Sequence, residues 1–379
     1  MSSAVVNLDE FGEKLGDILK SGAAEFLMFG DSTFEESVPP DSDMIEDDLR
    51  IKQALPKGTR SIEAIALQNE IPENFVTIPR DEKITIRRFV DGSIRTKYMG
   101  EVLRNESGAP LILSHIGAIM VGLESHSVKP IIFDSIFGIY LPGPKILSDS
   151  TFDQIKSLSG EKRSFGEIQV EQIDEEDTQS TLRSSAGGKI RARMHDLEIK
   201  IMNLAPEDGY WTAIDGALRH PKFYILKKAI GVAKSFSHKV IFLGNDYRPP
   251  RTISHLSRLR VGQRTPLYRY KLAKENTNDL SRVVFWYLRI RSSPPTMEPM
   301  GGIVKVDMPY DSNDTDNIFE KANTLSSSLL NVSNPSVFPR PRWPNYIYPI
   351  RIAEEYLSTA LMSEEMFVRI GLAIKRKGA

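Results

Sequence analysis

In residues 84–93 the chain reads ITIRRFVDGS, an apolar, β-branched run that ends in an Asp-Gly pair. A second run with the same ending, YWTAIDGA, occupies residues 210–217. Runs of this composition predict strands. The two strands would carry Asp91 and Asp215 at their ends, although an Asp-Gly pair is also a common signal for a simple hairpin turn.

The clearest predicted helix, residues 189–204, lies between these two pairs. Its apolar residues recur every three or four positions and form one stripe, with Glu198 at the edge of that stripe. A carboxylate in this position is costly unless it is paired or bound to a cation. We expect Asp91, Glu198 and Asp215 to meet at one point. The simpler alternative for Glu198 is an ion pair with Arg191 or another nearby base.

Carboxylates gathered in this way suit Mg²⁺ or Mn²⁺, which prefer oxygen ligands. Such an ion can activate water and neutralise a phosphate, so the sequence predicts a metal-dependent phosphodiester hydrolase. Lys234 follows a small Gly-Val-Ala segment at a predicted strand end and is a candidate for neutralising the scissile phosphate. The alternative for Lys234 is an ordinary surface lysine.

Composition narrows the remaining classes. The 379 residues are 40% hydrophobic and 26% charged, as is usual for a soluble globular protein. The absence of cysteine excludes disulfides, thiolate metal sites and a cysteine nucleophile. We find no zinc-type histidine pairing, no Gly-x-Ser-x-Gly elbow and no phosphate-binding loop. No apolar stretch is long enough to span a membrane and no signal segment is visible, so we expect a cytoplasmic location.

The net charge of −1 conceals an uneven distribution of charge. Residues 31–50 hold eight acidic residues and one basic residue, whereas residues 248–271 hold seven basic residues and no acidic one. Arginines follow phosphates and tyrosines stack on bases, so the basic segment predicts a nucleic-acid contact. A solvated loop or a partner-binding surface is the alternative. The predicted contact residues are Arg248, Arg251, Arg258, Arg260, Arg264, Tyr268 and Arg269.

The chain as a whole predicts an α/β fold, with a ribonuclease-H-like mixed sheet flanked by helices and an N-terminal helical extension. We expect residues 1–80 to form an N-terminal helix and acidic linker, and residues 81–379 to form the main domain with an insertion at about residues 141–188. Helices are expected at residues 8–27, 61–73, 189–204 and 348–373, with one short helix in the polar connection 141–177. Strands are expected at residues 84–90, 94–99, 110–121, 129–140, 210–215, 227–235, 240–243, 281–290 and 302–308.

Several motifs in this order resemble those of the NurA nucleases. They are FVDGSIR (89–95), RMHDLE (193–198), AIDGAL (213–218), IGVAKS (230–235), TPLY (265–268), WYLR (286–289), VKVDMP (304–309) and YPIRI (348–352). The resemblance covers the chain from about residue 83 to its end. It depends on the number and order of the motifs, because each motif alone is common.

The resemblance implies a ribonuclease-H-like deoxyribonuclease that acts as a homodimer with Mn²⁺ or Mg²⁺. It implies cleavage of single-stranded DNA and of duplex ends, together with a HerA-type hexameric ATPase, in end resection or phage defence. Asp91, Glu198 and Asp215 would be metal ligands, and Lys234 the basic site residue. The family's closing helix often supplies a further His or Asp. Here Glu355, or alternatively Glu354, is the candidate for that position.

Two motifs depart from the family pattern, with Ala217 after the second Asp-Gly pair and Asp307 where a Glu is usual. A catalytically weakened DNA-binding or assembly subunit on the same fold is therefore the main alternative. An RNA-directed nuclease and an actin-like phosphotransferase are further alternatives. The first would recognise 2′-hydroxyls, and the second would need ATP.

Overall fold

The computed structural model describes most of the chain. The described residues are 2–22, 25–28, 62–67, 71, 74–81, 83–104, 107–124, 127–143, 146–173, 179–218, 220–226, 228–237, 240–243, 252–271, 282–292, 299–310, 317–333 and 347–378. The acidic linker predicted at residues 30–48 and most of the irregular stretch 331–345 lie outside these residues.

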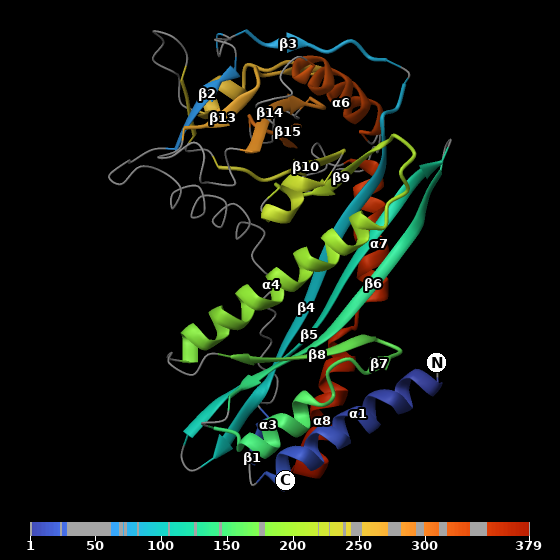
Figure 1. Cartoon of the computed structure of the whole chain (residues 1–379), viewed down its shortest axis with the longest axis vertical. Helices are drawn as coiled ribbons and strands as arrows, with labels where there is room; N and C mark the ends of the chain where they lie inside the picture. Colours follow the sequence, from blue (N-terminus) through green and yellow to red (C-terminus); the bar gives the residue numbers. More distant parts are fainter. Residues whose placement is uncertain are drawn as a thin grey trace.

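One large mixed sheet dominates the fold (Figure 1), which confirms the predicted α/β class. The ribonuclease-H-like assignment stays a prediction. The strands follow one another across the sheet in the order β11 (Val240–Leu243), β2 (Ile62–Ala66), β13 (Tyr268–Tyr270), β14 (Val283–Arg289), β15 (Ile303–Pro309), β10 (Ala229–Ala233), β9 (Trp211–Asp215), β4 (Ile86–Arg104), β5 (Ser107–Glu124), β6 (Ser127–Pro142), β8 (Gly166–Ile173) and β7 (Lys162–Arg163). Three short strands join this path, namely β1 (Glu25–Met28) on β4, and β12 (Gln263–Arg264) and β3 (Val76–Thr77), which pair with each other.

The three longest strands form an antiparallel meander, β4–β5–β6, in which neighbours in sequence are neighbours in the sheet. Asp91 and Gly92 lie inside β4, opposite Ile119 and Ala118 of β5. The expected break between residues 84–90 and 94–99 was therefore wrong, because the strand continues through the Asp-Gly pair without a turn. The predicted strands 110–121 and 129–140 are confirmed as parts of β5 and β6.

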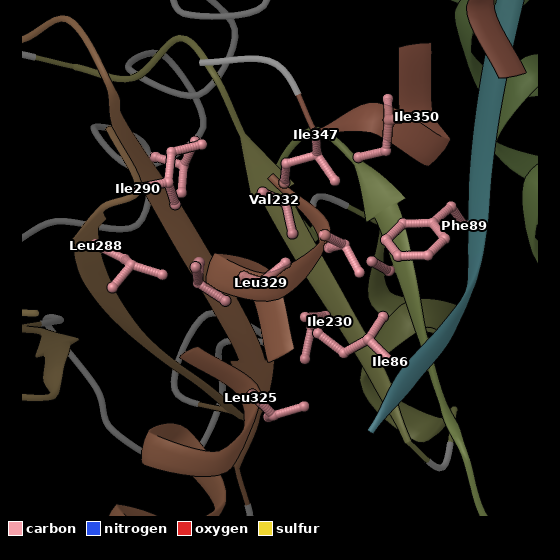
Figure 2. Packing of buried hydrophobic residues seen from close by; sticks show 14 of the residues in the cluster. Ile86, Phe89, Ile230, Val232, Leu288, Ile290, Leu325, Leu329, Ile347 and Ile350 are labelled. Carbon is pink, nitrogen blue, oxygen red and sulfur yellow. The ribbon is translucent and has the colours of Figure 1, made fainter. Parts of the chain in front are cut away.

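Two helices cover opposite faces of this meander, α4 (Gln179–Asn203) in front and α7 (Tyr348–Ala360) behind (Figure 1). Side chains alternate between the faces of a strand. Val90 belongs to the apolar cluster that contains Leu197 and Ile201 of α4. Phe89 belongs to the cluster that contains Ile350 of α7 (Figure 2). A residue of β4 therefore faces α7 at odd positions near Asp91 and faces α4 at even positions.

The second of these clusters is closed by a third helix, α6 (Ile318–Val332). Leu325 and Leu329 of α6 pack into this cluster together with strand residues such as Ile230 and with Ile350 of α7 (Figure 2). Trp286 of β14 is fully buried here and donates a hydrogen bond to the Ser326 hydroxyl at 3.0 Å. Burial of these side chains therefore holds β4, β9, β10 and β15 in one layer and presents α7 to the ends of the strands.

The two ends of the chain pack together at the far end of the meander. Helix α1 (Ser2–Ser21) buries Leu8, Phe11, Leu15 and Leu19 and lies along α8 (Glu364–Gly378), as Figure 1 shows. Gly12 and Gly16 permit this contact, since a Cβ at either residue would lie 2.5–2.7 Å from backbone oxygens of α8. The amphipathic stripe predicted for residues 8–27 therefore packs within the chain, although the helix ends at Ser21.

Other element predictions were wrong in identifiable ways. Residues 62–66 form strand β2, not a helix, and the connection 141–177 contributes β7 and β8 besides its short helix α3 (Asp149–Lys156). Helix α4 begins at Gln179, ten residues before the predicted start at residue 189, and runs through Gly187 and Gly188. The closing helix is divided into α7 and α8 around residues 361–363.

Strands β1, β2 and β3 from residues 1–80 join the main sheet, while the predicted domain division stays a prediction. The remaining described helices are the single-turn η2 (Pro221–Ile225) and the short α5 (Thr252–Leu256). Among the described residues, no helix combines the length and the apolarity needed to cross a membrane.

His115 connects the sheet to the junction between α7 and α8. Its side chain on β5 is buried, and Nδ1 accepts a hydrogen bond from the Met362 backbone N–H at 2.9 Å. Nε2 must then carry the proton, and it has no hydrogen-bond partner among the described residues. Burial lowers the pKa of His115 to about 4, so the imidazole is neutral in the folded protein at neutral pH.

This neutral histidine predicts acid-sensitive stability. In the unfolded chain its pKa is about 6.5, so the unfolded state binds the proton first as the pH falls. The contribution is present above pH 6.5 and is lost as the pH falls toward about 4, by up to about 3 kcal/mol. Urea unfolding measured between pH 7 and pH 4.5 tests this prediction.

His115→Asn is the matched control, because its amide oxygen can accept from Met362 and it does not titrate. Its free energy of unfolding should fall less steeply over the same pH range than that of the unaltered chain. Equal slopes for the two proteins would contradict the assignment.

Candidate functional site

The predicted site residues meet where β9 and β10 end beside the interior of β4. β4, β9 and β10 run parallel, with Val90 opposite Ile214 and Asp215 opposite Val232. Continuing the first register places Asp91 beside Asp215. Lys234 lies two positions beyond Val232, on the same face. Asp91, Asp215 and Lys234 therefore share the face that α7 covers, because each has the parity of a residue in the α7 cluster.

The chain leaves β9 through a turn that only glycine adopts readily. Gly216 has φ +100°, and its N–H donates to the Val232 carbonyl at 3.0 Å. Gly231 on the neighbouring strand has no room for a side chain, because a Cβ there would lie 2.7 Å from the Gly216 carbonyl oxygen and 2.8 Å from the Leu218 nitrogen. The turn thus lies directly against β10 and holds Asp215 at the end of its strand.

Lys234 lies between two carboxylates from different elements. Its ammonium is 3.0 Å from Oδ2 of Asp215 and 2.5 Å from Oε1 of Glu354 on α7. Burial alone would lower the pKa of Lys234, but the charges of Asp215 and Glu354 raise it above its ordinary value. Lys234 is therefore protonated, and it is not the ordinary surface lysine of the alternative interpretation.

Asp91 is the least compensated member of this group. Its side chain is buried, with 7% of its surface exposed, and no hydrogen bond or ion pair reaches its carboxylate from the described residues. Burial raises the pKa of Asp91 well above its ordinary value, and the charge of Asp215 raises it further, while Lys234 acts in the opposite direction. The site thus carries more negative charge than Lys234 balances.

Glu198 approaches β4 from the other face. Its carboxylate lies over Gly92, where a Cβ would be 2.6 Å from Oε1. It is buried and pairs with the imidazole of His195, one turn earlier on α4, with Nδ1 2.9 Å from Oε2. Its charge also raises the pKa of Asp91. The structure therefore brings Asp91 and Asp215 together as expected, but it places Glu198 across the strand and pairs it with His195, not with Arg191.

The donor chemistry of this group fits a hard divalent cation. The oxygen atoms that Asp91, Asp215 and Glu354 offer belong to carboxylates, which Mg²⁺ and Mn²⁺ prefer as ligands. The unpartnered Asp91 carboxylate is the group whose charge a cation would compensate. In the part of the chain that the structure describes, no three acidic or histidine side chains lie close enough to share an ion. Lys234 supplies the positive charge that separates Asp215 from Glu354 in this arrangement.

Helix α7 decides between the two candidate glutamates. Glu354 contacts Lys234, whereas Glu355 forms an ion pair with Arg351 at 3.0 Å and is more exposed. Helical spacing in the sequence already places Glu354 on the inner face of α7, because it lies four residues after Ile350 and three before Leu357, and both of these residues are buried. Geometry thus favours Glu354 as the residue from this helix, although we predicted Glu355 first.

The basic segment agrees only partly with the predicted nucleic-acid contact. Arg258 and Arg260 are exposed, Arg269 is half-buried, and Arg248 and Arg251 lie outside the described residues. Arg264 and Tyr268 are fully buried, so these two predicted contacts were wrong. The Arg264 guanidinium donates to the Asn323 side chain and the Thr265 carbonyl, and Tyr268 packs beside Phe242 and Phe285.

The half-buried Arg269 of β13 lies some distance from the carboxylates. β13 is separated from β9 by β14, β15 and β10, which is four strand spacings, or about 19 Å. A nucleic acid that touches both would have to extend along the sheet over that distance.

Comparison with known proteins gives one similar structure to report. No protein-family model matches the chain, and no curated protein matches it. The chain is similar to the crystal structure of the NurA nuclease from Sulfolobus solfataricus, over 92% of this chain and 97% of that one, with 12% sequence identity and a TM-score of 0.42. This is the family that the sequence motifs resemble. At so low an identity and TM-score, residue roles cannot be transferred, and they follow from the geometry of the site.

The contact of Glu198 with Gly92 predicts that Gly92→Ala destabilises the protein. The added methyl group would lie 2.6 Å from Glu198 Oε1 and 2.8 Å from Met194 Cγ, so the buried Glu198 and Met194 side chains must move from their present positions. We expect a loss of about 1–3 kcal/mol in the free energy of unfolding. Denaturant unfolding followed by circular dichroism measures it.

Gly188→Ala is the matched control, since a Cβ at this residue meets no atom within 4 Å. It lies within α4, where replacing glycine by alanine should stabilise the helix by about 0.5–1 kcal/mol. The close approach over Gly92 would be refuted if both substitutions changed stability in the same direction.

Proposed function

We propose that this chain is a metal-dependent phosphodiester hydrolase that acts on DNA. The observation that carries the proposal is the unpartnered, buried Asp91 carboxylate beside Asp215, Glu354 and the single ammonium of Lys234. A structural ion-pair network would balance its charges. An excess of negative charge around a buried carboxylate is instead typical of a site that receives a cation or a cationic group.

We assign the binding of Mn²⁺ or Mg²⁺ to Asp91 and Asp215. Glu354 would join them as the third carboxylate only after it parts from Lys234, because the described side chains do not lie close enough to share an ion in this arrangement. Such an ion, when bound, would supply positive charge at the phosphate and increase the acidity of the attacking water. Glu198 lies on the opposite face of β4, where its role is to hold its own negative charge close to Asp91 while His195 fixes its orientation. Glu198 as a direct ligand stays the less favoured form of this proposal.

Lys234 has two tasks in this proposal. Without substrate, its ammonium holds Asp215 and Glu354 and limits the repulsion among the carboxylates. With substrate, the same protonated group can neutralise a non-bridging phosphate oxygen as a point charge. Both tasks need the permanent positive charge that the neighbouring acids enforce.

DNA as the substrate follows from the motif resemblance, together with the exposed Arg258 and Arg260. The finer proposals have the same origin. They are cleavage of single strands and duplex ends, a homodimer, a HerA-type hexameric ATPase as partner, a cytoplasmic location, and a role in end resection or phage defence.

Asp91→Asn should separate activity from folding. We expect at least about 100-fold slower cleavage of end-labelled DNA in Mn²⁺ or Mg²⁺, and no cleavage by either protein in EDTA. The same change removes a buried charge. A carboxyl whose pKa is raised on folding reduces stability above its unfolded pKa, so the metal-free variant should be more stable than the unaltered chain at pH 7.

Mn²⁺ provides a readout that does not depend on cleavage. It should raise the melting temperature of the unaltered chain and raise that of Asp91→Asn or Asp215→Asn much less, because a ligand of the folded state stabilises it. Equal shifts in all three proteins, with cleavage retained, would refute the assigned ligands.

Glu354→Gln and Glu355→Gln form a matched pair on consecutive residues of α7. We expect Glu354→Gln to reduce kcat by at least about tenfold, since it removes a carboxylate from Lys234, and Glu355→Gln to change kcat less than about twofold. Steady-state cleavage rates, with melting temperatures as a folding check, measure both. The reverse ranking would restore Glu355 as the fourth ligand.

A catalytically weakened DNA-binding or assembly subunit is the second candidate function. The observation that favours it is the position of Lys234, whose ammonium already compensates Asp215 and Glu354. No cleavage in Mn²⁺ or Mg²⁺, and no thermal shift by either ion, would favour this function over the nuclease.

A further inference from the structure

Strand β15 buries two charged residues that take no part in the proposed chemistry. Lys305 and Asp307 are 5% and 3% exposed, respectively. The alternate residues Val304, Val306 and Met308 enter the apolar cluster beneath α6 and α7. Lys305 and Asp307 must therefore lie on the opposite face of the sheet from Asp215 and Lys234. Two buried charges are costly, so their contacts need an explanation.

The contacts of Asp307 join β15 to the turn that follows Asp215. Oδ2 of Asp307 accepts a hydrogen bond from the backbone N–H of Leu218 at 3.1 Å. The Lys305 ammonium lies 2.7 Å from Oδ1 and compensates the carboxylate as an ion pair. The same ammonium lies 4.9 Å from the ring centre of Phe285, which also favours a buried positive charge.

The turn is thereby held from two sides. Asp307 lies opposite Gly231 on the neighbouring strand. Because Gly231 has no side chain, the backbone of Gly216 and Leu218 can pack directly against it. Gly216 donates to the Val232 carbonyl on one side, and Leu218 donates to Asp307 on the other. Asp215 is the residue immediately before this doubly held segment, so its carboxylate can turn only as far as the segment allows.

We infer that Asp307 is a positioning residue, which orients Asp215 through the Leu218 N–H while Lys305 neutralises its charge. The inference depends on the proposed function only in that Asp215 belongs to the active site. Asp307 touches no group of the site. It acts because a buried N–H without an acceptor is costly, so loss of the acceptor would release the turn and the Asp215 carboxylate with it.

A pair of double variants isolates the acceptor from the charge. Lys305→Met fills the lysine volume among aromatic rings without a charge. Combined with Asp307→Asn, it keeps a side-chain oxygen for Leu218. Combined with Asp307→Leu, which has nearly the same shape, it does not. The two proteins differ only in the acceptor, and comparable melting temperatures would establish that both are folded.

We expect the Asn double variant to keep kcat for DNA cleavage within about threefold of the unaltered chain. The Leu double variant should lose at least about tenfold in kcat with KM nearly unchanged, because the buried Leu218 N–H would be left without an acceptor while the substrate contacts are intact. Amide hydrogen exchange gives a second readout. Leu218 and Gly216 should both exchange faster in the Leu variant than in the Asn variant.

Two results would overturn the inference. One is equal kcat in the two double variants, whether both keep it or both lose it, because the acceptor would then not be responsible. The other is faster exchange confined to Leu218 with Gly216 still protected, because the turn beside Asp215 would then not depend on Asp307. If the unaltered chain cuts no DNA, the proposed function fails, and exchange at Gly216 alone then decides whether Asp307 holds the turn.

Discussion

Repulsion among closely spaced carboxylates is the constraint on which the site depends. Asp91, Asp215 and Glu354 come from separate elements and gather around the one ammonium of Lys234, with Glu198 close behind Asp91. Such a group persists only if the surrounding fold forces it together. The apolar cluster between the sheet, α6 and α7 supplies that force, because α7 cannot move Glu354 away without exposing Ile350 and Leu357.

The two faces of the sheet hold different parts of the site. The α7 face gathers the charged groups, and the α4 face carries Glu198 with its His195 partner. The backbone between them is held by close approaches at Gly92 and Gly231, where a side chain would collide with Glu198 and with the turn after Asp215. These glycines therefore matter for contact across the layers as well as for conformation. The buried Asp307 completes this support from behind.

The sequence predicted which residues gather at the site better than how they are arranged. Asp91, Asp215 and a lysine near them followed from local runs of residues and are neighbours in space, although Asp91 lies inside its strand and not at the end. The face on which Glu198 lies did not follow, because helix periodicity defines a buried stripe and not which side of a sheet receives it. Burial of Arg264 and Tyr268 was likewise invisible, since composition does not reveal that β13 is covered by aromatic residues. The uninterrupted β4 contradicted the turn expected of Asp-Gly, because pairing with β5 outweighs local turn preference.

The order of the strands also sets the order in which the molecule can assemble. The meander β4–β5–β6 joins neighbours in sequence, so its contacts close short loops and should form early. The pairing of β4 with β9 must bring together residues more than a hundred positions apart, and Glu354 arrives from the end of the chain. The site should therefore form late in folding. An early intermediate would then contain the long strands without the assembled group of carboxylates and Lys234. The mutual repulsion of the carboxylates would oppose folding only in the final steps.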